Sequence, residues 1–259
     1  METLRIGIIG TGKINTAVTE GLLRAGIGNL EVVVSPRSRD RAERLASRHA
    51  SVRVGTDNQD VLECSDVVFA ALLPGAAEKI LSGLRFRRRH TIFCLVPTLT
   101  LSDLKQILAP AGRIFRAVPL LSVSYNLGPL VYYPENSEAE DLLGRLGHAL
   151  AAPDERQLHL LWALTGLISP YYALLARLSG SLIERGVDPD LAAGYTARLF
   201  QALSALPLGS GQDLDVLSEE AATPGGMNAM ALRMIGDSGA FESFRTALDA
   251  VIMRYPEIT

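Results

Sequence analysis

Apolar residues in the first part of the chain fall into short runs separated by amphipathic stretches. The runs Leu4–Ile9, Leu30–Val34 and Val52–Val54 consist mainly of Val, Ile and Leu, as expected for strands buried on both faces of a parallel sheet. Further strands are predicted at Asp66–Pro74, Thr91–Val96, Arg113–Pro119 and Leu130–Tyr133. Helices are predicted after the first run and over residues 40–49, 58–64, 102–108 and 137–150. This alternation predicts an α/β fold with a doubly wound parallel sheet.

The strand pattern disappears after Ala151-Ala152-Pro153-Asp154. Helices alone are predicted beyond it, at Glu155–Leu164, Pro170–Arg185, Pro189–Leu206, Leu214–Ala222, Asn228–Ser238 and Ala240–Tyr255. Capping residues support these bounds, because Gly186 follows one helix and Asp188 precedes the next. We therefore expect a Rossmann-type sheet domain over residues 1–152 and a helical domain over residues 153–259.

A glycine turn follows the first predicted strand and precedes the first predicted helix. Its glycines allow a close backbone approach to a pyrophosphate, whose charge the helix N-terminus then receives. Asn15 replaces the third glycine of the usual fingerprint, and a plain turn is the alternative interpretation. Because the turn leads a βαβ pattern, we expect dinucleotide binding. The expected cofactor contacts in this turn are Gly10, Thr11, Gly12, Lys13 and Ile14.

The end of the second predicted strand bears on the type of cofactor. An NAD site places a carboxylate there, whereas this chain has Ser35, Arg37 and Ser38, which suit the 2′-phosphate of NADPH. A solvated arginine is the alternative, and NADH is the less favoured cofactor. The loops after later strands are also expected to contact the cofactor, through Ala71, Leu72, Pro74 and Pro119.

Composition excludes several function classes. The 259 residues are 48% hydrophobic with a net charge of −3, which suits a large core and gives no general attraction to nucleic acid. The basic cluster Arg85–His90 is interpreted as a solvated loop, and Cys64 and Cys94 as reduced, buried thiols. No Cys/His spacing indicates a metal site. The apolar start runs directly into the glycine turn, which argues against a signal peptide and favours a cytoplasmic location.

The segment Leu158–Ile183 is apolar enough to raise the question of a membrane span. Pro170, Arg177 and several glycines interrupt it, and a charged arginine is costly in hydrocarbon. We therefore expect no membrane partner here, but a helix pair buried in a core or in a dimer interface.

Four motifs resemble the pyrroline-5-carboxylate reductase family, and together they span nearly the whole chain. They are Ile6–Gly12 continuing to Glu20–Gly26, Ser65–Ala70 with Pro74, Arg116–Pro119, and Thr223–Gly226 followed by Gly239-Ala240-Phe241. The resemblance implies an NADPH-dependent reductase of a cyclic imine. It also implies an intertwined homodimer built by the helical domain, with an active site where the cofactor meets those helices.

Several positions depart from the family pattern. Leu120, Leu121 and Ser122 follow Pro119 where the family has asparagine, threonine and proline, and Leu73 replaces a lysine. Thr165–Tyr172 replaces a serine- and glycine-rich stretch and carries one extra residue. Met227 and Asn228 replace two threonines after the glycine pair. The pocket for the substrate carboxylate is therefore altered and less polar.

Candidate chemical groups gather at the starts of two predicted helices. Thr165, Ser169 and Tyr172 are the candidate catalytic residues, because a hydroxyl there could donate a proton or a hydrogen bond to the substrate. The alternative for a tyrosine there is an interface ring. Tyr171, Thr223, Gly225, Gly226 and Asn228 are the candidate substrate-binding residues. The glycine pair exposes helix N–H groups that could hold a carboxylate, and an ordinary Asn228 cap is the alternative.

Three hypotheses remain open from the sequence. The first is an NADPH-dependent reductase of a pyrroline-type imine, either the proline-pathway substrate or a relative. The second is a reductase of another imine or a ketone in specialised metabolism, which Leu120 and Leu121 would suit. The third is a nucleotide-binding dimer that has lost catalysis, because Asn15 and the missing polar residues depart from the family.

Overall fold

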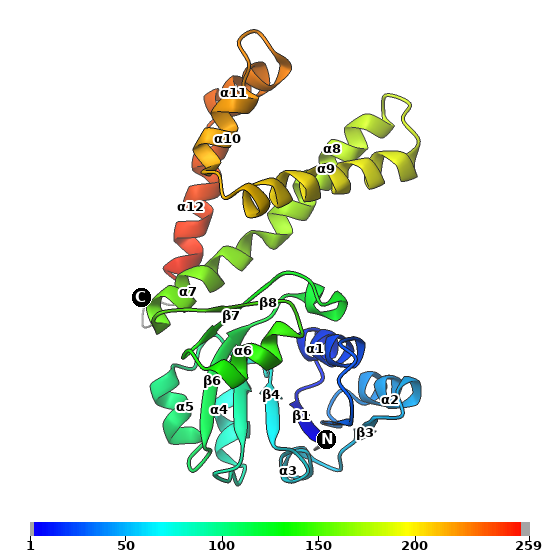
Figure 1. Cartoon of the computed structure of the whole chain (residues 1–259), viewed down its shortest axis with the longest axis vertical. Coiled ribbons are helices and arrows are strands. Elements are labelled where there is room, and N and C mark those ends of the chain that lie inside the picture. Colours follow the sequence, from blue (N-terminus) through cyan, green and yellow to red (C-terminus); the bar gives the residue numbers. More distant parts are fainter. Residues whose placement is uncertain (1–2, 255–259) are drawn as a thin grey trace. The chain divides into compact units, whose positions relative to one another are not determined.

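The computed structural model describes residues 3–254. These residues form two compact units, the first ending at Trp162 and the second covering Ala163–Arg254. The first unit contains a sheet flanked by helices, and the second consists of helices (Figure 1).

Eight strands of the described residues form one sheet in the order β3-β2-β1-β4-β5-β6-β7-β8. Their bounds are β1 Leu4–Ile9, β2 Leu30–Val34, β3 Val52–Val54, β4 Val67–Ala70, β5 Thr91–Cys94, β6 Arg113–Val118, β7 Pro129–Tyr133 and β8 His148–Ala151. Neighbouring strands are parallel except β6 and β7, which are antiparallel. The predicted class, a doubly wound and mostly parallel sheet, is confirmed.

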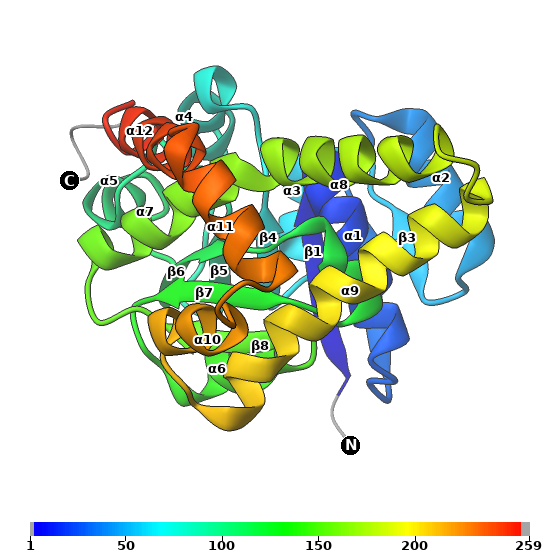
Figure 2. The ribbon, with the colours of Figure 1, turned by 90° about the horizontal axis from the view of Figure 1, so that it is seen from above.

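Helices cover both faces of this sheet (Figure 2). One face packs on α1 (Lys13–Arg24), α2 (Arg39–Arg48) and α6 (Ser137–Gly144), and the other on α3 (Asn58–Glu63), α4 (Pro74–Ser82) and α5 (Leu101–Ile107). Adjacent strand residues alternate between the two cores: Ile8 joins the first and Ile9 the second. Burial on both faces explains the unbroken apolar runs in the sequence.

Residues 137–150 do not form one helix, so that prediction is wrong. Helix α6 ends at Gly144, and β8 then pairs in parallel with β7. The backbone N–H of His148 donates to the Gly128 carbonyl at 2.9 Å. Gly147 permits this approach, since a Cβ atom there would lie 2.6 Å from the Gly128 carbonyl oxygen. The apolar spacing of this segment suited either element, and strand pairing decided the outcome.

The fourth strand was predicted too long. Strand β4 ends at Ala70, and Pro74 begins α4, a helix that the pattern did not predict. Proline fits the first position of a helix, where its missing N–H has no partner to lose. A second unpredicted element is the 3-10 helix η1 (Leu121–Tyr125), which lies between β6 and β7. The connection that contains η1 is too short for a crossover helix, which explains the antiparallel β7.

Gly21 brings η1 close to α1. A Cβ atom at Gly21 would lie 2.2 Å from the Val123 carbonyl oxygen, so a larger residue would push the two segments apart. The Asn126 side chain donates to the carbonyl oxygens of Gly21 at 2.9 Å and Arg145 at 2.7 Å. The contact therefore fixes α1 to the segment that leads into β7.

The helices after the sheet run close to their predicted bounds. They are α7 (Glu155–Leu164), η2 (Thr165–Leu167), α8 (Ile168–Ile183), α9 (Pro189–Ser210), α10 (Leu214–Ala221), α11 (Met227–Asp237) and α12 (Ala240–Ile252). The Asp188 side chain caps α9 by accepting from Leu191 N at 3.0 Å. Helix α8 begins before Pro170, which its first turn accommodates. The predicted end of the last helix, Tyr255, lies outside the described residues.

One helical run among the described residues, Glu155–Ile183, is long and apolar enough to cross a membrane by length and composition. Only 17% of its most apolar window is buried within the chain. A core of this same chain therefore does not cover it. Burial in a dimer interface, the other expectation, stays a prediction.

Candidate functional site

The turn after β1 is built around Gly10. Its φ of +88° is one that glycine adopts without strain. A Cβ atom at Gly10 would lie 2.2 Å from the Ala71 carbonyl oxygen and 3.2 Å from the Leu72 side chain. The turn therefore packs directly against the loop that follows β4.

Gly12 precedes α1 and faces open space. A Cβ atom there would meet no other atom within 4 Å, and Gly12 provides no side-chain cap for the helix. Lys13 is exposed and Ile14 is half-buried. The N–H groups in the first turn of α1 lack a side-chain cap, and such an uncapped start can bind an anion.

The end of β2 is joined to the glycine turn. Gly10 N donates to Ser35 Oγ at 2.8 Å, and Thr11 Oγ1 donates to the Ser35 carbonyl at 3.2 Å. Ser35 is fully buried, so its hydroxyl serves this junction. Its predicted contact with a 2′-phosphate stays a prediction.

Two exposed arginines and Ser38 lie just beyond this junction. Arg39 pairs with Glu43 at 2.7 Å, whereas Arg37 forms no ion pair with the described residues. Ser38 is half-buried and precedes α2. Arg37 is therefore the guanidinium group in this loop that is available to a phosphate.

The remaining predicted cofactor contacts follow β4 and β6. Ala71 N donates to the Ile9 carbonyl at 3.0 Å, which places Ala71 and Leu72 beside the glycine turn. Pro74 is exposed at the start of α4, and Pro119 is buried after β6. Ligands of such sheets bind outside the carboxyl ends of the strands, and these residues lie there.

Candidate residues of the second unit lie where η2 passes into α8. Thr165 begins η2, and Ser169 lies in the first turn of α8. The Tyr171 ring lies 5.5 Å from the Tyr172 ring and 6.2 Å from the Phe200 ring of α9. Tyr171 thus helps to pack α8 against α9. Tyr172 is 64% exposed against 40% for Tyr171, so it is the more exposed of the two tyrosines.

The second candidate cluster forms the turn between α10 and α11. Gly225 has a φ of +75°, and a Cβ atom at Gly226 would lie 2.6 Å from Thr223 Oγ1. The interpretation of Asn228 as a helix cap is wrong, because Gly226 is the N-cap residue. Asn228 Nδ2 instead donates to the Ala221 carbonyl at 3.1 Å. The start of α11 thus keeps N–H groups without a side-chain cap.

Arg116 is a buried charged residue whose role the sequence did not suggest. Its guanidinium donates to Glu155 at 2.7 Å and to the Pro97 carbonyl at 3.0 Å. Glu155 also accepts from Leu101 N at 2.6 Å, and the Trp162 ring centre lies 5.5 Å from the guanidinium. One ion pair thus ties β6, α5 and α7 together beside Pro119. A charged residue inside an apolar strand was the available signal.

The cysteines differ in burial, since Cys94 is buried as expected and Cys64 is only half-buried. Burial raises the pKa of the Cys94 thiol to about 11, and both cysteines are free. Arg89 pairs with Asp66 at 3.2 Å. Burial, aided by Arg89 and Arg87, lowers the pKa of His90 to about 4, so the predicted solvated loop has a buried end.

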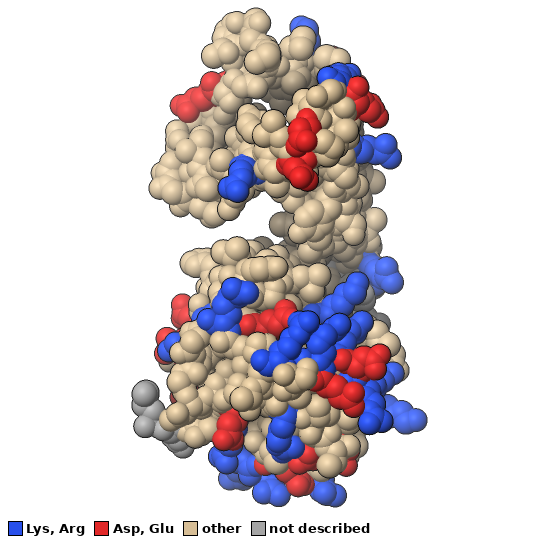
Figure 3. Space-filling view, turned by 90° about the vertical axis from the view of Figure 1, so that its right-hand side faces the viewer, with Lys and Arg blue, Asp and Glu red and all other residues tan. Residues whose placement is uncertain are grey.

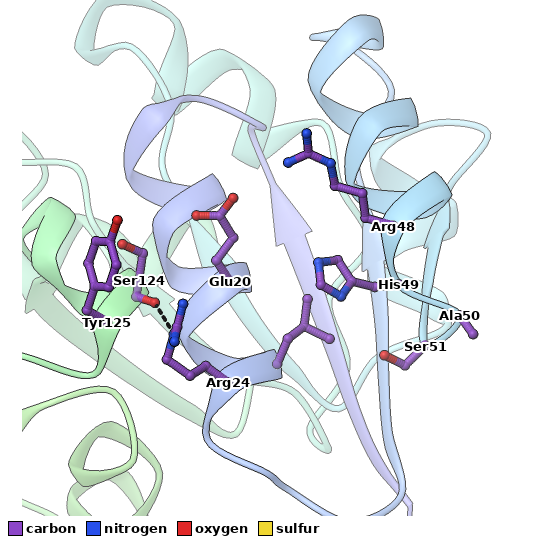
Figure 4. Close-up of a pocket in the computed structure, with 9 residues that line it drawn as sticks. Glu20, Arg24, Arg48, His49, Ala50, Ser51, Ser124 and Tyr125 are labelled. Carbon is purple, nitrogen blue, oxygen red and sulfur yellow. Dashed lines mark hydrogen bonds between the residues drawn. The ribbon is translucent and has the colours of Figure 1, made fainter.

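A cavity of about 890 Å³ lies apart from the glycine turn (Figure 4). Glu20 and Arg24 of α1 face Arg48 and His49 across it. Arg24 Nε donates to the Ser124 carbonyl at 2.9 Å. No predicted site residue lines it. Among the described residues, no cluster of His, Cys, Asp or Glu could hold a metal ion.

A family model described as "NADP oxidoreductase coenzyme F420-dependent" matches residues 5–96. That range contains the glycine turn, the end of β2 and the loop after β4. The match therefore covers most of the residues expected to contact the cofactor.

Two curated relatives extend the similarity along the chain. Pyrroline-5-carboxylate reductase 1 of Bacillus spizizenii is 26% identical over 268 residues, covering 98% of this chain and 89% of the relative. Pyrroline-5-carboxylate reductase 2 of Rattus norvegicus is 28% identical over 269 residues, covering 98% and 84% respectively. The resemblance expected from the four motifs is thereby confirmed.

A solved structure agrees in fold. The crystal structure of Plasmodium falciparum pyrroline carboxylate reductase with NADP bound has a TM-score of 0.85 and 16% identity. The alignment covers 100% of this chain and 99% of the other. Both the sheet and the helical part are therefore shared with that fold.

Proposed function

We propose that this divergent relative of the pyrroline-5-carboxylate reductases is an NADPH-dependent oxidoreductase that reduces a cyclic imine. The observation that best supports this proposal is the Gly10 turn, which packs on Ala71 and leads into the uncapped start of α1. It lies in a chain similar over 98% of its length to a pyrroline-5-carboxylate reductase. The proposed substrate is pyrroline-5-carboxylate or a close analogue.

Each part of the cofactor site has a proposed role. The uncapped start of α1 receives the pyrophosphate, and Arg37 binds the 2′-phosphate through charge-assisted hydrogen bonds. Bound NADPH supplies the hydride that reduces the C=N bond. The residues proposed to surround it are Gly10, Thr11, Gly12, Lys13, Ile14, Ser35, Arg37, Ser38, Ala71, Leu72, Pro74 and Pro119.

The second unit supplies the proposed substrate groups. The hydroxyl of Tyr172, with Thr165 and Ser169, donates a hydrogen bond or a proton to the imine nitrogen. The uncapped N–H groups after Gly226 bind the substrate carboxylate, because a helix start attracts anions. Tyr171, Thr223, Gly225, Gly226 and Asn228 complete this proposed pocket.

The proposal includes a homodimer and a cytoplasmic location, with a small-molecule substrate. Large apolar side chains on α8, α9 and α11 are exposed within the single chain. Many exposed apolar side chains on one group of helices are typical of an interface, and we propose that a second copy of the chain covers them.

The proposal is tested by mixing the protein with NADPH and pyrroline-5-carboxylate and following NADPH consumption. Turnover that needs both compounds supports it. Arg37→Ala should then raise the KM for NADPH far more than the KM for NADH. Arg44→Ala, an exposed arginine of α2, is the control and should change neither. Equal effects of Arg37→Ala on both cofactors would remove Arg37 from the phosphate site.

A reductase of another imine or a ketone is the second candidate. Leu121, where the resemblance leads us to expect a polar residue, is 53% exposed, and an apolar wall would suit a less polar substrate. NADPH consumption with other cyclic imines but not with pyrroline-5-carboxylate would select this candidate. NADPH binding without turnover of any imine or ketone would instead indicate a nucleotide-binding dimer without catalysis.

A further inference from the structure

Asn15 occupies the position where the dinucleotide fingerprint has its third glycine. It lies in the first turn of α1 and is fully buried. The two hydrogens of its Nδ2 are shared among three backbone carbonyl oxygens, those of Ile9 at 3.0 Å, Gly10 at 2.9 Å and Phe69 at 3.3 Å. One side chain therefore connects the end of β1, the glycine turn and β4.

The hydrogen-bond pattern fixes the orientation of the Asn15 amide. The NH₂ group is a donor and Oδ1 an acceptor, so a flipped amide would direct its oxygen at three carbonyl oxygens. In the observed orientation Oδ1 is buried and has no hydrogen-bond partner among the described residues. An unsatisfied buried acceptor is costly. The three donor contacts hold the amide in place in spite of that cost.

These contacts hold the Ile9–Gly10 peptide from both sides. The C=O and N–H of a trans peptide point in opposite directions. The Ile9 carbonyl accepts from Asn15, while Gly10 N on the other side donates to Ser35 Oγ at 2.8 Å. The Ile9 carbonyl also accepts from Ala71 N at 3.0 Å, so the plane of this peptide is set by two side chains, one from α1 and one from the end of β2, and by the backbone after β4.

The next peptide, Gly10–Thr11, is held from one side only. Its carbonyl accepts from Asn15, so its N–H must point away from Asn15. That N–H has no acceptor among the described residues. It belongs to the turn whose backbone is proposed to approach the pyrophosphate.

We infer that Asn15 is a positioning residue, which holds the Ile9–Gly10 and Gly10–Thr11 peptides and so fixes the turn that leads into the proposed pyrophosphate-binding start of α1. This inference rests on the proposed NADPH site. Asn15 in place of the third glycine is therefore expected to strengthen cofactor binding. A glycine at this position would lack the contacts with the three carbonyl oxygens. The third glycine of the fingerprint is needed for close helix–strand packing, and here an amide fills that place.

The test measures binding of two ligands to the whole protein by isothermal titration calorimetry. NADPH contains the pyrophosphate, whereas adenosine 2′-monophosphate contains the 2′-phosphate and lacks the pyrophosphate. Asn15→Gly and Asn15→Ala should weaken NADPH binding about tenfold, as expected for one lost charge-assisted hydrogen bond. Both should leave binding of adenosine 2′-monophosphate within about twofold of wild type, a difference that the loss of a charged hydrogen bond would exceed.

Thr19→Val is the matched control. Thr19 is buried in the same helix, and its Oγ1 donates to the Asn15 carbonyl at 2.7 Å rather than to the turn. The substitution removes a buried hydrogen bond and should leave both affinities unchanged. Thermal denaturation of every variant shows whether it is folded at the temperature of the titration.

Two results would overturn the inference alone. One is Asn15→Gly binding NADPH as tightly as the wild type, and the other is an equal loss for both ligands, which indicates a general structural role. A wild-type protein that binds neither ligand would overturn the proposed function and the inference together. The failure of each is therefore distinguishable.

Discussion

The two units of the chain differ in how far they bury their apolar side chains. In the first unit Phe69, Phe93 and Phe115 stack in the sheet and are nearly inaccessible. In the second unit Leu208 is 87% exposed and Met227 is 84% exposed. On the face that Figure 3 shows, Lys, Arg, Asp and Glu are more frequent on the first unit than on the second.

This difference shows what each unit needs in order to be stable. A sheet covered by helices on both faces buries its apolar residues within one chain. Helices that are apolar on several sides can bury these residues only against a further protein surface. The first unit is therefore expected to depend on its own core, and the second on contact with another copy.

The largest effect is expected from substitutions that disrupt the proposed dimer contact of the second unit. Leu199→Glu combined with Leu203→Glu places two charges on one exposed apolar stripe of α9. Burying unpaired charges is strongly unfavourable, so the double variant should be a monomer and the wild type a homodimer. Light scattering after gel filtration measures this, and Gln201→Glu on the same helix is the control. A monomeric wild type at all concentrations would contradict the comparison.

A core truncation in the first unit should rank next. Phe93→Ala removes a ring stacked between Phe69 at 4.9 Å and Phe115 at 5.1 Å. The expected loss in the free energy of unfolding is about 3–5 kcal/mol, independent of protein concentration. Urea denaturation gives this value, with the surface substitution Arg44→Ala as the reference. A small loss would mean that the first unit does not depend on this core.

Breaking the buried ion pair should have a somewhat smaller effect. Glu155→Ala leaves the fully buried Arg116 without its carboxylate partner, which should lower the free energy of unfolding by about 3 kcal/mol. Arg5→Ala breaks the exposed Arg5–Asp66 pair and should cost below about 1 kcal/mol. Equal losses in the two variants, measured by urea denaturation, would argue against the burial-based explanation.

Acid should affect the first unit through His90, with the smallest effect of the set. Its pKa is about 4 in the folded chain against an ordinary 6.5. Between these values the unfolded chain binds a proton that the folded chain does not, so stability falls as the pH drops from 6.5 to 4. The loss over this window should be about 2–3 kcal/mol. In His90→Gln the dependence of unfolding free energy on pH over this window should be flatter, and an unchanged slope would exclude His90.

Much of the fold could be predicted because the strands are buried on both faces. The bounds of β1, β2 and β3 match their apolar runs, since a short unbroken apolar run is typical of a buried strand. Strand β8 was missed because the residues His148–Ala151 fit a helix equally well. Only pairing with β7, a contact distant in sequence, selects the strand.

The candidate site could be predicted where backbone geometry alone decides. The positive φ of Gly10 and the uncapped Gly12 follow from the strand, the turn and the helix that meet there. The contacts of Asn15 and Arg116 could not be predicted, because each depends on a carbonyl group distant in sequence, that of Phe69 in β4 and that of Pro97 in the turn after β5. Sequence spacing carries no information about such partners until the sheet order is known.

The close approach at Gly21 gives α1 a second attachment besides β1. Arg24 Nε also donates a hydrogen bond to the Ser124 carbonyl, so the C-terminal end of α1 is attached to the segment that precedes β7. A methyl group at position 21 would have to displace the Val123 carbonyl and would weaken the contact between α1 and this segment. Helix α1 thus links the glycine turn at its start to the segment before β7 at its end.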